Sequence, residues 1–216
     1  MGLMEASRRA DALRASPRMF DSDLLDKLSR VHPAVPVFIF APAIVVLTVL
    51  AAEGSSVSAL IGLFVAGYFF WTLSEYWIHR VIFHFEPEDG FGARLHWIIH
   101  GVHHDHPNDP LRLVMPPSVS VPLSSLFCVG FWAVLGTPLW YAFGAGFLAG
   151  YLFYDMTHYF LHHHKPKSRL GKRLRELHMR HHFQDHTTGF GISAPYWDMF
   201  FRTFPSKARK TGGEGA

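Results

Sequence analysis

Two short segments with the same histidine spacing are the most informative feature of the sequence. His100, His103 and His104 form an HxxHH motif, and residues 178–182 repeat it. Residues three and four positions apart lie on one face of an α-helix, so each motif would present three imidazoles together. Neutral imidazole is a common protein ligand for zinc, iron and copper. The two motifs therefore predict a metal site.

Two further histidine pairs, at spacings of five and four residues, extend the set to ten. Ten imidazoles are more than one ion can use, so the sequence predicts two metal ions with about five nitrogens each. Five nitrogens leave one position of an octahedral ion open for oxygen or water, whereas structural zinc closes with four ligands. Spacing alone does not choose between iron and zinc. The predicted ligands are His79, His84, His100, His103, His104, His158, His162, His178, His181 and His182.

Three other residues are candidates for supporting these ligands. Glu75 and Asp155 stand in apolar surroundings one turn before His79 and His158, where a carboxylate can accept the second imidazole proton. An interhelical hydrogen bond is the equally weighted alternative for both. His96 is a further candidate neighbour of the site. For it, as for the remaining histidines, an ordinary hydrogen-bonded role is the favoured alternative.

The composition is that of a membrane protein rather than a soluble domain. Of 216 residues, 49% are hydrophobic and only 17% charged, and 20 are phenylalanine. The single cysteine, Cys128, excludes an internal disulfide. The formal net charge is +3, but no nucleic-acid-binding motif is present.

Four apolar segments predict an all-α integral membrane fold, with four transmembrane helices and a cytoplasmic helical cap that carries the histidines. At 1.5 Å per residue, His79 would lie about 30 Å from Ala59 and His158 about 28 Å from Leu139. The second and fourth spans would therefore deliver their histidines to the same membrane face. The predicted spans are residues 35–52, 59–78, 119–135 and 139–153.

The distribution of basic residues predicts the topology. In this four-span arrangement all 20 Lys and Arg residues fall on one side, and the short turns 53–58 and 136–138 contain none. Because basic residues near spans favour the cytoplasmic side, both termini and every histidine motif are expected there. The expected location is a bacterial inner membrane or the endoplasmic reticulum.

Three regions describe the domain organisation. Residues 1–31 are expected to form a tail, loose over 1–16, followed by a short interfacial helix; a helix packed on protein is the equal alternative. Residues 32–204 form the four-span domain, and 205–216 a C-terminal tail. Within the domain, the basic segment 165–180 is interpreted as a solvated face near lipid headgroups. The alternative interpretation is a surface that docks an acidic partner. Residues 190–204 read as an aromatic interfacial belt or the wall of an acyl-chain site.

Five segments together resemble the fatty acid hydroxylase superfamily, and within it the fatty acid and ceramide 2-hydroxylases. The resemblance covers about residues 32–204, and its diagnostic parts are RLVMPP and the two HxxHH motifs. The segments are EYWIHRVIFH at 75–84, HGVHH at 100–104, RLVMPP at 112–117, YDMTHYFLHH at 154–163 and HMRHHF at 178–183.

The resemblance implies a membrane di-iron monooxygenase that hydroxylates carbon 2 of long-chain fatty acyl groups, free or in sphingolipids, with O2 as co-substrate. Carried onto matching positions, it gives the same ten histidines as iron ligands, with zinc expected in some purified material because zinc binds nitrogen sites more tightly than ferrous iron. Larger family members carry a haem domain before the first span. Too few residues precede the span here, so the resemblance implies a separate electron donor, such as a cytochrome b5-like protein or a ferredoxin.

Alternative functions remain open at this stage. A sterol desaturase, methyl oxidase or carotenoid hydroxylase of the same superfamily shares the histidine pattern, although RLVMPP argues against these ring substrates. Outside the enzymes, a histidine-rich metal transporter predicts polar ligands near mid-membrane. A structural zinc protein predicts closed four-ligand sites.

Overall fold

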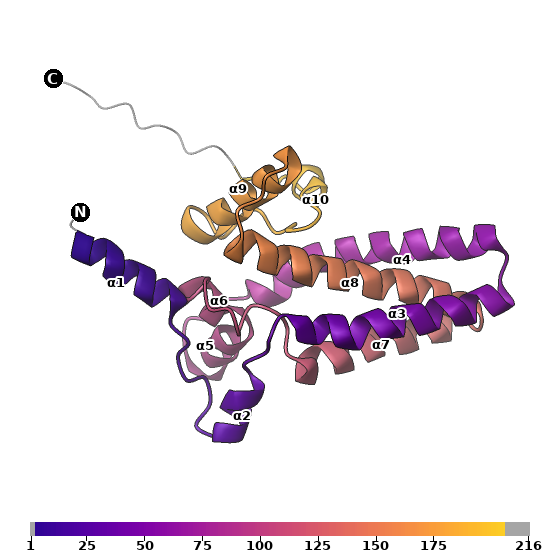
Figure 1. Ribbon diagram of the computed structural model, residues 1–216, viewed down its shortest axis with the longest axis horizontal. Coiled ribbons are helices and arrows are strands. Elements are labelled where there is room, and N and C mark those ends of the chain that lie inside the picture. Colours follow the sequence, from indigo (N-terminus) through magenta and orange to yellow (C-terminus); the bar gives the residue numbers. More distant parts are fainter. Residues whose placement is uncertain (1–2, 206–216) are drawn as a thin grey trace.

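Four long helices lie side by side and run to and fro along the longest axis of the molecule (Figure 1). The computed structural model describes residues 3–205, which are helices and connecting loops without a strand. The all-α prediction is therefore confirmed for the described part of the chain. The long helices are α3 (Ala34–Gly54), α4 (Val57–Trp77), α7 (Pro117–Leu135) and α8 (Leu139–His163).

Three segments are long and apolar enough to cross a membrane: Ala34–Gly54, Val57–Phe83 and Pro117–Leu135. They leave many large apolar side chains exposed, including Phe38, Phe69 and Trp132. The predicted fourth span forms α8, but α8 is not among the three. Its buried residues recur from Ala142 to His162, because it packs between the other helices. A helix enclosed by protein needs little lipid-compatible surface, so α8 carries glycine, tyrosine and histidine instead of a uniformly apolar sequence.

Glycines bring α4 and α8 into backbone contact. A Cβ atom added at Gly146 would lie 1.9 Å from the carbonyl oxygen of Phe64, and one added at Gly67 would lie 2.0 Å from that of Phe143. Small residues permit such close approach between membrane helices. The contact fixes the position of α4 along α8; His79 follows directly after α4, and α8 carries His158.

A π-helix, η1 (Ile78–Phe83), continues α4 and explains the five-residue spacing of its histidines. The backbone N–H of His84 donates to the carbonyl of His79 at 3.2 Å, which is the i to i+5 bond of a π-turn. In an α-helix, five residues would turn the second imidazole far from the first. The wider turn lets both imidazoles point to the same side.

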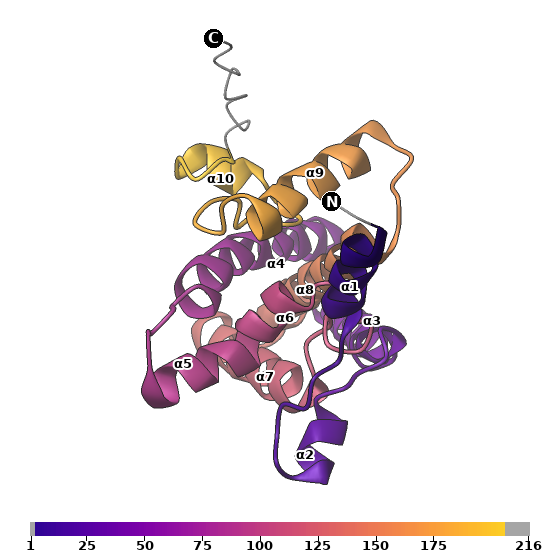
Figure 2. The ribbon, with the colours of Figure 1, turned by 90° about the vertical axis from the view of Figure 1, so that its left-hand side faces the viewer.

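The shorter elements gather at one end of the four-helix bundle, where the view along the bundle shows them in front of it (Figure 2). α1 and α2 precede the bundle, the next three connect α4 to α7, and the last two follow α8. They are α1 (Leu3–Arg14), α2 (Asp23–Leu28), α5 (Gly90–His96), η2 (Trp97–Gly101), α6 (Val102–Asp105), α9 (Arg169–Phe183) and α10 (Tyr196–Phe200).

The N-terminal segment differs from the expected loose tail over residues 1–16. Residues 3–14 form α1, and two of its last carbonyls are used by the loop after α6: Ala12 accepts from the ring Nδ1 of His106 at 2.6 Å, and Leu13 accepts from the backbone N–H of Asn108 at 2.9 Å. The polar sequence gave no sign of these contacts. The predicted short helix is α2, which Ser22 caps. The predicted C-terminal tail, 205–216, lies outside the described residues except for Pro205.

Candidate metal centre

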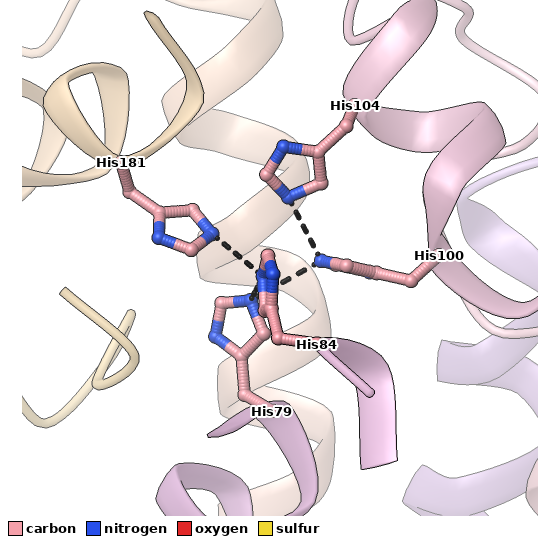
Figure 3. Close-up of side chains that lie close together, drawn as sticks. All are labelled: His79, His84, His100, His104 and His181. Atoms are coloured by element: carbon pink, nitrogen blue, oxygen red, sulfur yellow. Dashed lines mark hydrogen bonds between the residues drawn. The ribbon is translucent and has the colours of Figure 1, made fainter. Parts of the chain in front are cut away.

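The structure brings all ten predicted histidines together in two groups of five. Within each group the nitrogen atoms offered as ligands lie within 4.8 Å of one another. Seven of the ten side chains are buried and the other three half-buried. The first histidine cluster contains His79, His84, His100, His104 and His181, whose rings converge in Figure 3; the second contains His103, His158, His162, His178 and His182.

Each HxxHH motif contributes to both clusters. His100 and His104, one helical turn apart, face the first cluster, while His103 faces the second. In the later motif the assignment is reversed: His181 faces the first cluster, whereas His178 and His182 face the second. Adjacent histidines thus diverge to different clusters. The rings of His104 and His182 stack at 4.3 Å between centroids, so the two clusters lie directly beside each other.

The nitrogen separations match the edges of a coordination polyhedron. In the first cluster, Nε2 of His84 lies 3.2 Å from Nε2 of His79 and 3.0 Å from that of His181, and the Nε2 atoms of His100 and His104 are 3.0 Å apart. Metal–nitrogen bonds of about 2.1 Å place neighbouring ligands about 3.0 Å apart on an octahedral ion and about 3.4 Å apart on a tetrahedral one. The observed separations of 3.0–3.2 Å are therefore short enough for these nitrogens to share one ion.

Hydrogen bonds on the far side of three rings determine which nitrogen faces the centre. The Nδ1 atom of His79 donates to the carbonyl of Phe190 at 2.8 Å, and that of His181 donates to the carbonyl of Thr188 at 2.7 Å. The Nδ1 atom of His84 lies 3.2 Å from a carboxylate oxygen of Glu86. Because each Nδ1 carries the proton, each Nε2 presents a lone pair to the others. Converging lone pairs repel unless a cation lies between them, so this cluster fits a metal ion.

The second histidine cluster is equally enclosed. The Nε2 atoms of His103 and His158 are buried and have no hydrogen-bond partner among the described residues. Nε2 of His178 lies 2.7 Å from that of His162 and 3.2 Å from that of His182. Orphaned buried nitrogens are costly unless something binds them, and a metal ion does so. Both clusters can therefore hold a metal.

The three predicted supporting residues are placed differently from the prediction. Glu75 does not contact His79; its carboxylate accepts from the backbone N–H of Ser193 at 2.8 Å and from the Ser193 hydroxyl. The Asp155 carboxylate faces the backbone N–H of Met115 and the hydroxyl of Tyr151, each at 3.4 Å, rather than His158. Each carboxylate thus joins a long helix to a loop distant in the sequence, a structural role like that of the interhelical alternative.

His96, the third supporting candidate, lies beside the first cluster without joining it. Its Nε2 atom is 3.9 Å from the Glu86 carboxylate, which also faces His84. That separation is too long for a hydrogen bond, and the same nitrogen has no such partner within the described residues.

A loop before α10 supports the first cluster, and sequence reasoning missed it. Phe190 and Thr188 offer only backbone carbonyls, which leave no trace in the residue types. Buried Asp198 holds the loop by accepting from the backbone N–H groups of Phe190 at 2.9 Å and Gly191 at 2.8 Å. The one available signal was a lone acid, Asp198, within the aromatic run 190–204.

Burial keeps the imidazoles outside the spanning helices neutral. Loss of hydration, followed by the charge of neighbouring imidazoles, lowers the pKa of His103 and of His181 to about 3 and that of His84 to about 4. A neutral imidazole keeps the lone pair that a metal needs. The clusters are therefore ready to bind metal at neutral pH.

These lowered pKa values predict that the metal-free protein becomes less stable in mild acid. The usual pKa of histidine is about 6.5. Below that pH the histidines of the unfolded chain become protonated, whereas the buried histidines of the folded chain stay neutral. The free energy of unfolding should therefore fall as the pH is lowered from 6.5 towards about 4. Thermal melting of chelator-treated protein between pH 7.5 and 4.5 measures this. A midpoint that stays constant over that range would contradict buried neutral clusters.

An apolar cavity of about 240 Å³ reaches both clusters. His100 of the first cluster and His103 and His158 of the second line one part of it. Leu25 and Leu28 of α2 line another part and are 50% and 53% exposed. The cavity therefore connects both candidate metal positions with apolar side chains at the molecular surface.

The RLVMPP segment, residues 112–117, forms a wall of this cavity and is tied to the N-terminal segment. Residues 112–116 line it. The buried guanidinium of Arg112 pairs with Asp26 at 2.9 Å and donates to the carbonyl of Pro17. Asp26 also pairs with Arg30 at 3.1 Å and accepts from the backbone N–H of Met19 at 2.7 Å. These contacts hold α2 over the cavity.

Comparisons with known proteins agree with this geometry. The model of the fatty acid hydroxylase family matches residues 64–203. Dihydroceramide fatty acyl 2-hydroxylase FAH1 of Arabidopsis thaliana is 39% identical over 202 residues, which cover 90% of this chain and 83% of the relative. Fatty acid 2-hydroxylase of Mus musculus is 37% identical over 209 residues, which cover 86% of this chain and 56% of the relative. A solved structure described as full-length scs7p, with only its hydroxylase domain visible, is 35% identical, with a TM-score of 0.79, and the match covers 85% of this chain and 70% of that one.

Proposed function

The chain belongs to the fatty acid hydroxylase family, and we propose that it is a membrane monooxygenase that hydroxylates carbon 2 of long fatty acyl chains, free or within sphingolipids. One observation carries the proposal: an apolar cavity joins exposed leucines at the surface to imidazoles of both histidine clusters. An acyl chain in that cavity would bring a C–H bond to the candidate metals. The relatives named as 2-hydroxylases support carbon 2 as the position.

The residues of this chain contribute mainly by positioning. His100, His103 and His158 bound the cavity from the metal side, so a substrate carbon held there faces both clusters. The apolar wall from Leu113 to Pro116 excludes water and accepts methylene groups. Holding the carbon next to the carbonyl against the imidazoles would then select carbon 2.

The ten histidines are proposed to ligate two iron ions. Five imidazoles in each cluster would hold one ion and would leave room for a further ligand, which suits a redox-active site. When bound, iron would supply the redox chemistry that activates O2, which the side chains cannot provide. The electrons are proposed to come from a separate protein, such as a cytochrome b5-like protein or a ferredoxin.

The proposed membrane arrangement has four spans, with α8 enclosed by α3, α4 and α7. The exposed apolar side chains of the three outer helices support it. Both turns at the far end of the bundle lack Lys and Arg, which supports a cytoplasmic location for the histidine end and both termini. The ligands lie at one end of the bundle rather than midway along it, unlike those expected of a transporter.

Lipid analysis tests the proposed reaction. Expression in a host that lacks 2-hydroxy lipids should produce acyl chains hydroxylated at carbon 2, measured by mass spectrometry. His103→Ala, which removes a ligand from the second cluster, should reduce these products below detection. The exposed His164, outside both clusters, provides a matched His164→Ala control that should retain them. Absence of the products with the intact chain, or hydroxyl groups on ring lipids instead, would refute the proposal.

A further inference from the structure

A concave surface of basic character lies on α9 and the loop before it, on the side away from the metal clusters. This basic groove has a volume of about 580 Å³ and includes Lys165, Lys172, Arg175, Met179 and Phe183. Both lysines are exposed, and Phe183 is 47% exposed at the groove. The groove thus combines positive charge with accessible apolar surface, and its Arg175, Met179 and Phe183 are of residue types enriched at protein interfaces.

Basic side chains far outnumber acidic ones in the segment that forms the groove. Between residues 165 and 180 the chain carries seven basic side chains and a single acidic one, Glu176. Arg173 and Arg180 both pair with Glu176, at 2.9 and 2.5 Å. The basic residues of the run are Lys165, Lys167, Arg169, Lys172, Arg173, Arg175 and Arg180.

The groove is separated from the clusters by a single helix. His178, His181 and His182 project from the opposite face of the same helix α9. An α-helix with its side chains is about 10–12 Å across, so a molecule seated in the groove lies within roughly that distance of the imidazoles. Figure 1 shows α9 over the end of α8 that carries His158 and His162.

The proposed reaction requires electrons that the histidine clusters and their imidazoles do not supply. Inserting one oxygen atom into a C–H bond consumes O2, two electrons and two protons and releases one water. A carrier that gives one electron at a time must therefore dock twice in each turnover. Such a carrier needs a surface close to the metals, and charge complementarity makes repeated docking fast.

We propose that the basic groove on α9 docks an acidic one-electron carrier protein, which passes electrons through α9 to the histidine clusters. This inference rests on the proposed monooxygenase function. A protein partner is favoured over lipid headgroups because the groove backs directly onto three of the ten histidines. The extensive apolar faces suited to lipid belong to α3, α4 and α7 instead.

Charge reversal at two exposed lysines tests the groove. The probe is a soluble, acidic, cytochrome b5-like haem protein, pre-reduced and mixed with the full-length iron-loaded enzyme, substrate and O2 in neutral detergent. Lys165→Glu/Lys172→Glu should slow haem oxidation on the order of tenfold at low salt and flatten its salt dependence. Arg8→Glu/Lys27→Glu, on α1 and α2, makes the same change in net charge at exposed positions and should react like the wild type.

A small neutral reductant in place of the haem protein separates the two proposals. With it, wild type and the groove variant should form equal amounts of 2-hydroxy product. If neither electron source gives product with the wild type, the proposed function fails. If product forms but the groove variant oxidises the haem protein as fast as the wild type, the docking proposal is overturned. A defect that appears only in bilayers of anionic lipid overturns it as well and assigns the groove to headgroups.

Discussion

Replacing His181 with alanine is expected to remove one metal ion from each chain, and replacing its neighbour His182 is expected to remove the other. The two residues are adjacent on α9, but His181 faces the first histidine cluster and His182 the second. Nε2 of His181 lies 3.0 Å from that of His84, whereas Nε2 of His182 lies 3.2 Å from that of His178. Loss of a direct ligand should weaken metal binding by more than the roughly 10–100-fold seen when a ligand's hydrogen-bond partner is lost.

Double variants make this expectation specific. His104→Ala/His181→Ala damages the first cluster twice and should leave about one ion per chain, because the second cluster is intact. His103→Ala/His104→Ala damages both clusters and should leave none. Metal content per chain, measured by mass spectrometry after dialysis, distinguishes the two variants. Circular dichroism checks that both remain helical.

The opposite result has a clear meaning. If the variant His104→Ala/His181→Ala lost both ions while the variant His103→Ala/His104→Ala kept one, the division into two clusters would be wrong. Hydroxylation should be lost in all of these variants, since the proposed reaction uses both ions. Metal content is therefore the decisive measurement and activity is not.

Much of the fold and of the site could be predicted from local patterns. Apolar segments of membrane-spanning length identified all four long helices, because lipid and core burial both demand such segments. The HxxHH spacing identified histidines that reach the site, but each motif divides its three imidazoles between the two clusters, and His100 lies in the π-helix η2 rather than in an α-helix. The predicted number of about five imidazoles for each of two ions agrees with the two clusters found.

Other features depend on contacts that no local pattern contains. The spacing of His79 and His84 gave no reason to expect a π-helix, and the allocation of neighbouring histidines to different clusters depends on how α6 and α9 pack. The acceptor for His79 is a backbone carbonyl 111 residues away, at Phe190. Glu75 was one candidate for that role because it is close in sequence, with an interhelical hydrogen bond as the equal alternative. It bonds Ser193 in the same loop instead, so its influence on His79 is indirect.

Adding a single methyl group at Gly146 is expected to destabilise the whole bundle. The new Cβ atom would lie 1.9 Å from the carbonyl oxygen of Phe64 and 2.7 Å from its carbonyl carbon. Both are backbone atoms and cannot rotate away, so α4 and α8 must separate. Overpacking of this kind costs about 1–3 kcal/mol, and more where backbone must move. Separation would also shift His79 relative to His158, so metal content should fall with stability.

Glycines elsewhere in the spans provide matched controls for Gly146→Ala. At Gly62, in α4, an added Cβ meets nothing within 4 Å, so Gly62→Ala should be neutral or stabilise by up to about 1 kcal/mol through helix propensity. At Gly150 the nearest atom is Cβ of Trp71, which is fixed by its backbone but lies at 2.7 Å, a less severe overlap than the 1.9 Å contact at Gly146. Gly150→Ala should therefore fall between the other two.

The ranking of these three variants is the test. At about 2–4 °C per kcal/mol for a chain of this size, a cost of about 1–3 kcal/mol lowers the melting temperature of Gly146→Ala by roughly 2–12 °C, measured as loss of ellipticity at one scan rate. Equal melting temperatures for Gly146→Ala and Gly62→Ala would mean that α4 and α8 do not touch through their backbones. In that case the contact would not set the heights of His79 and His158, and the two clusters would need another source of rigidity.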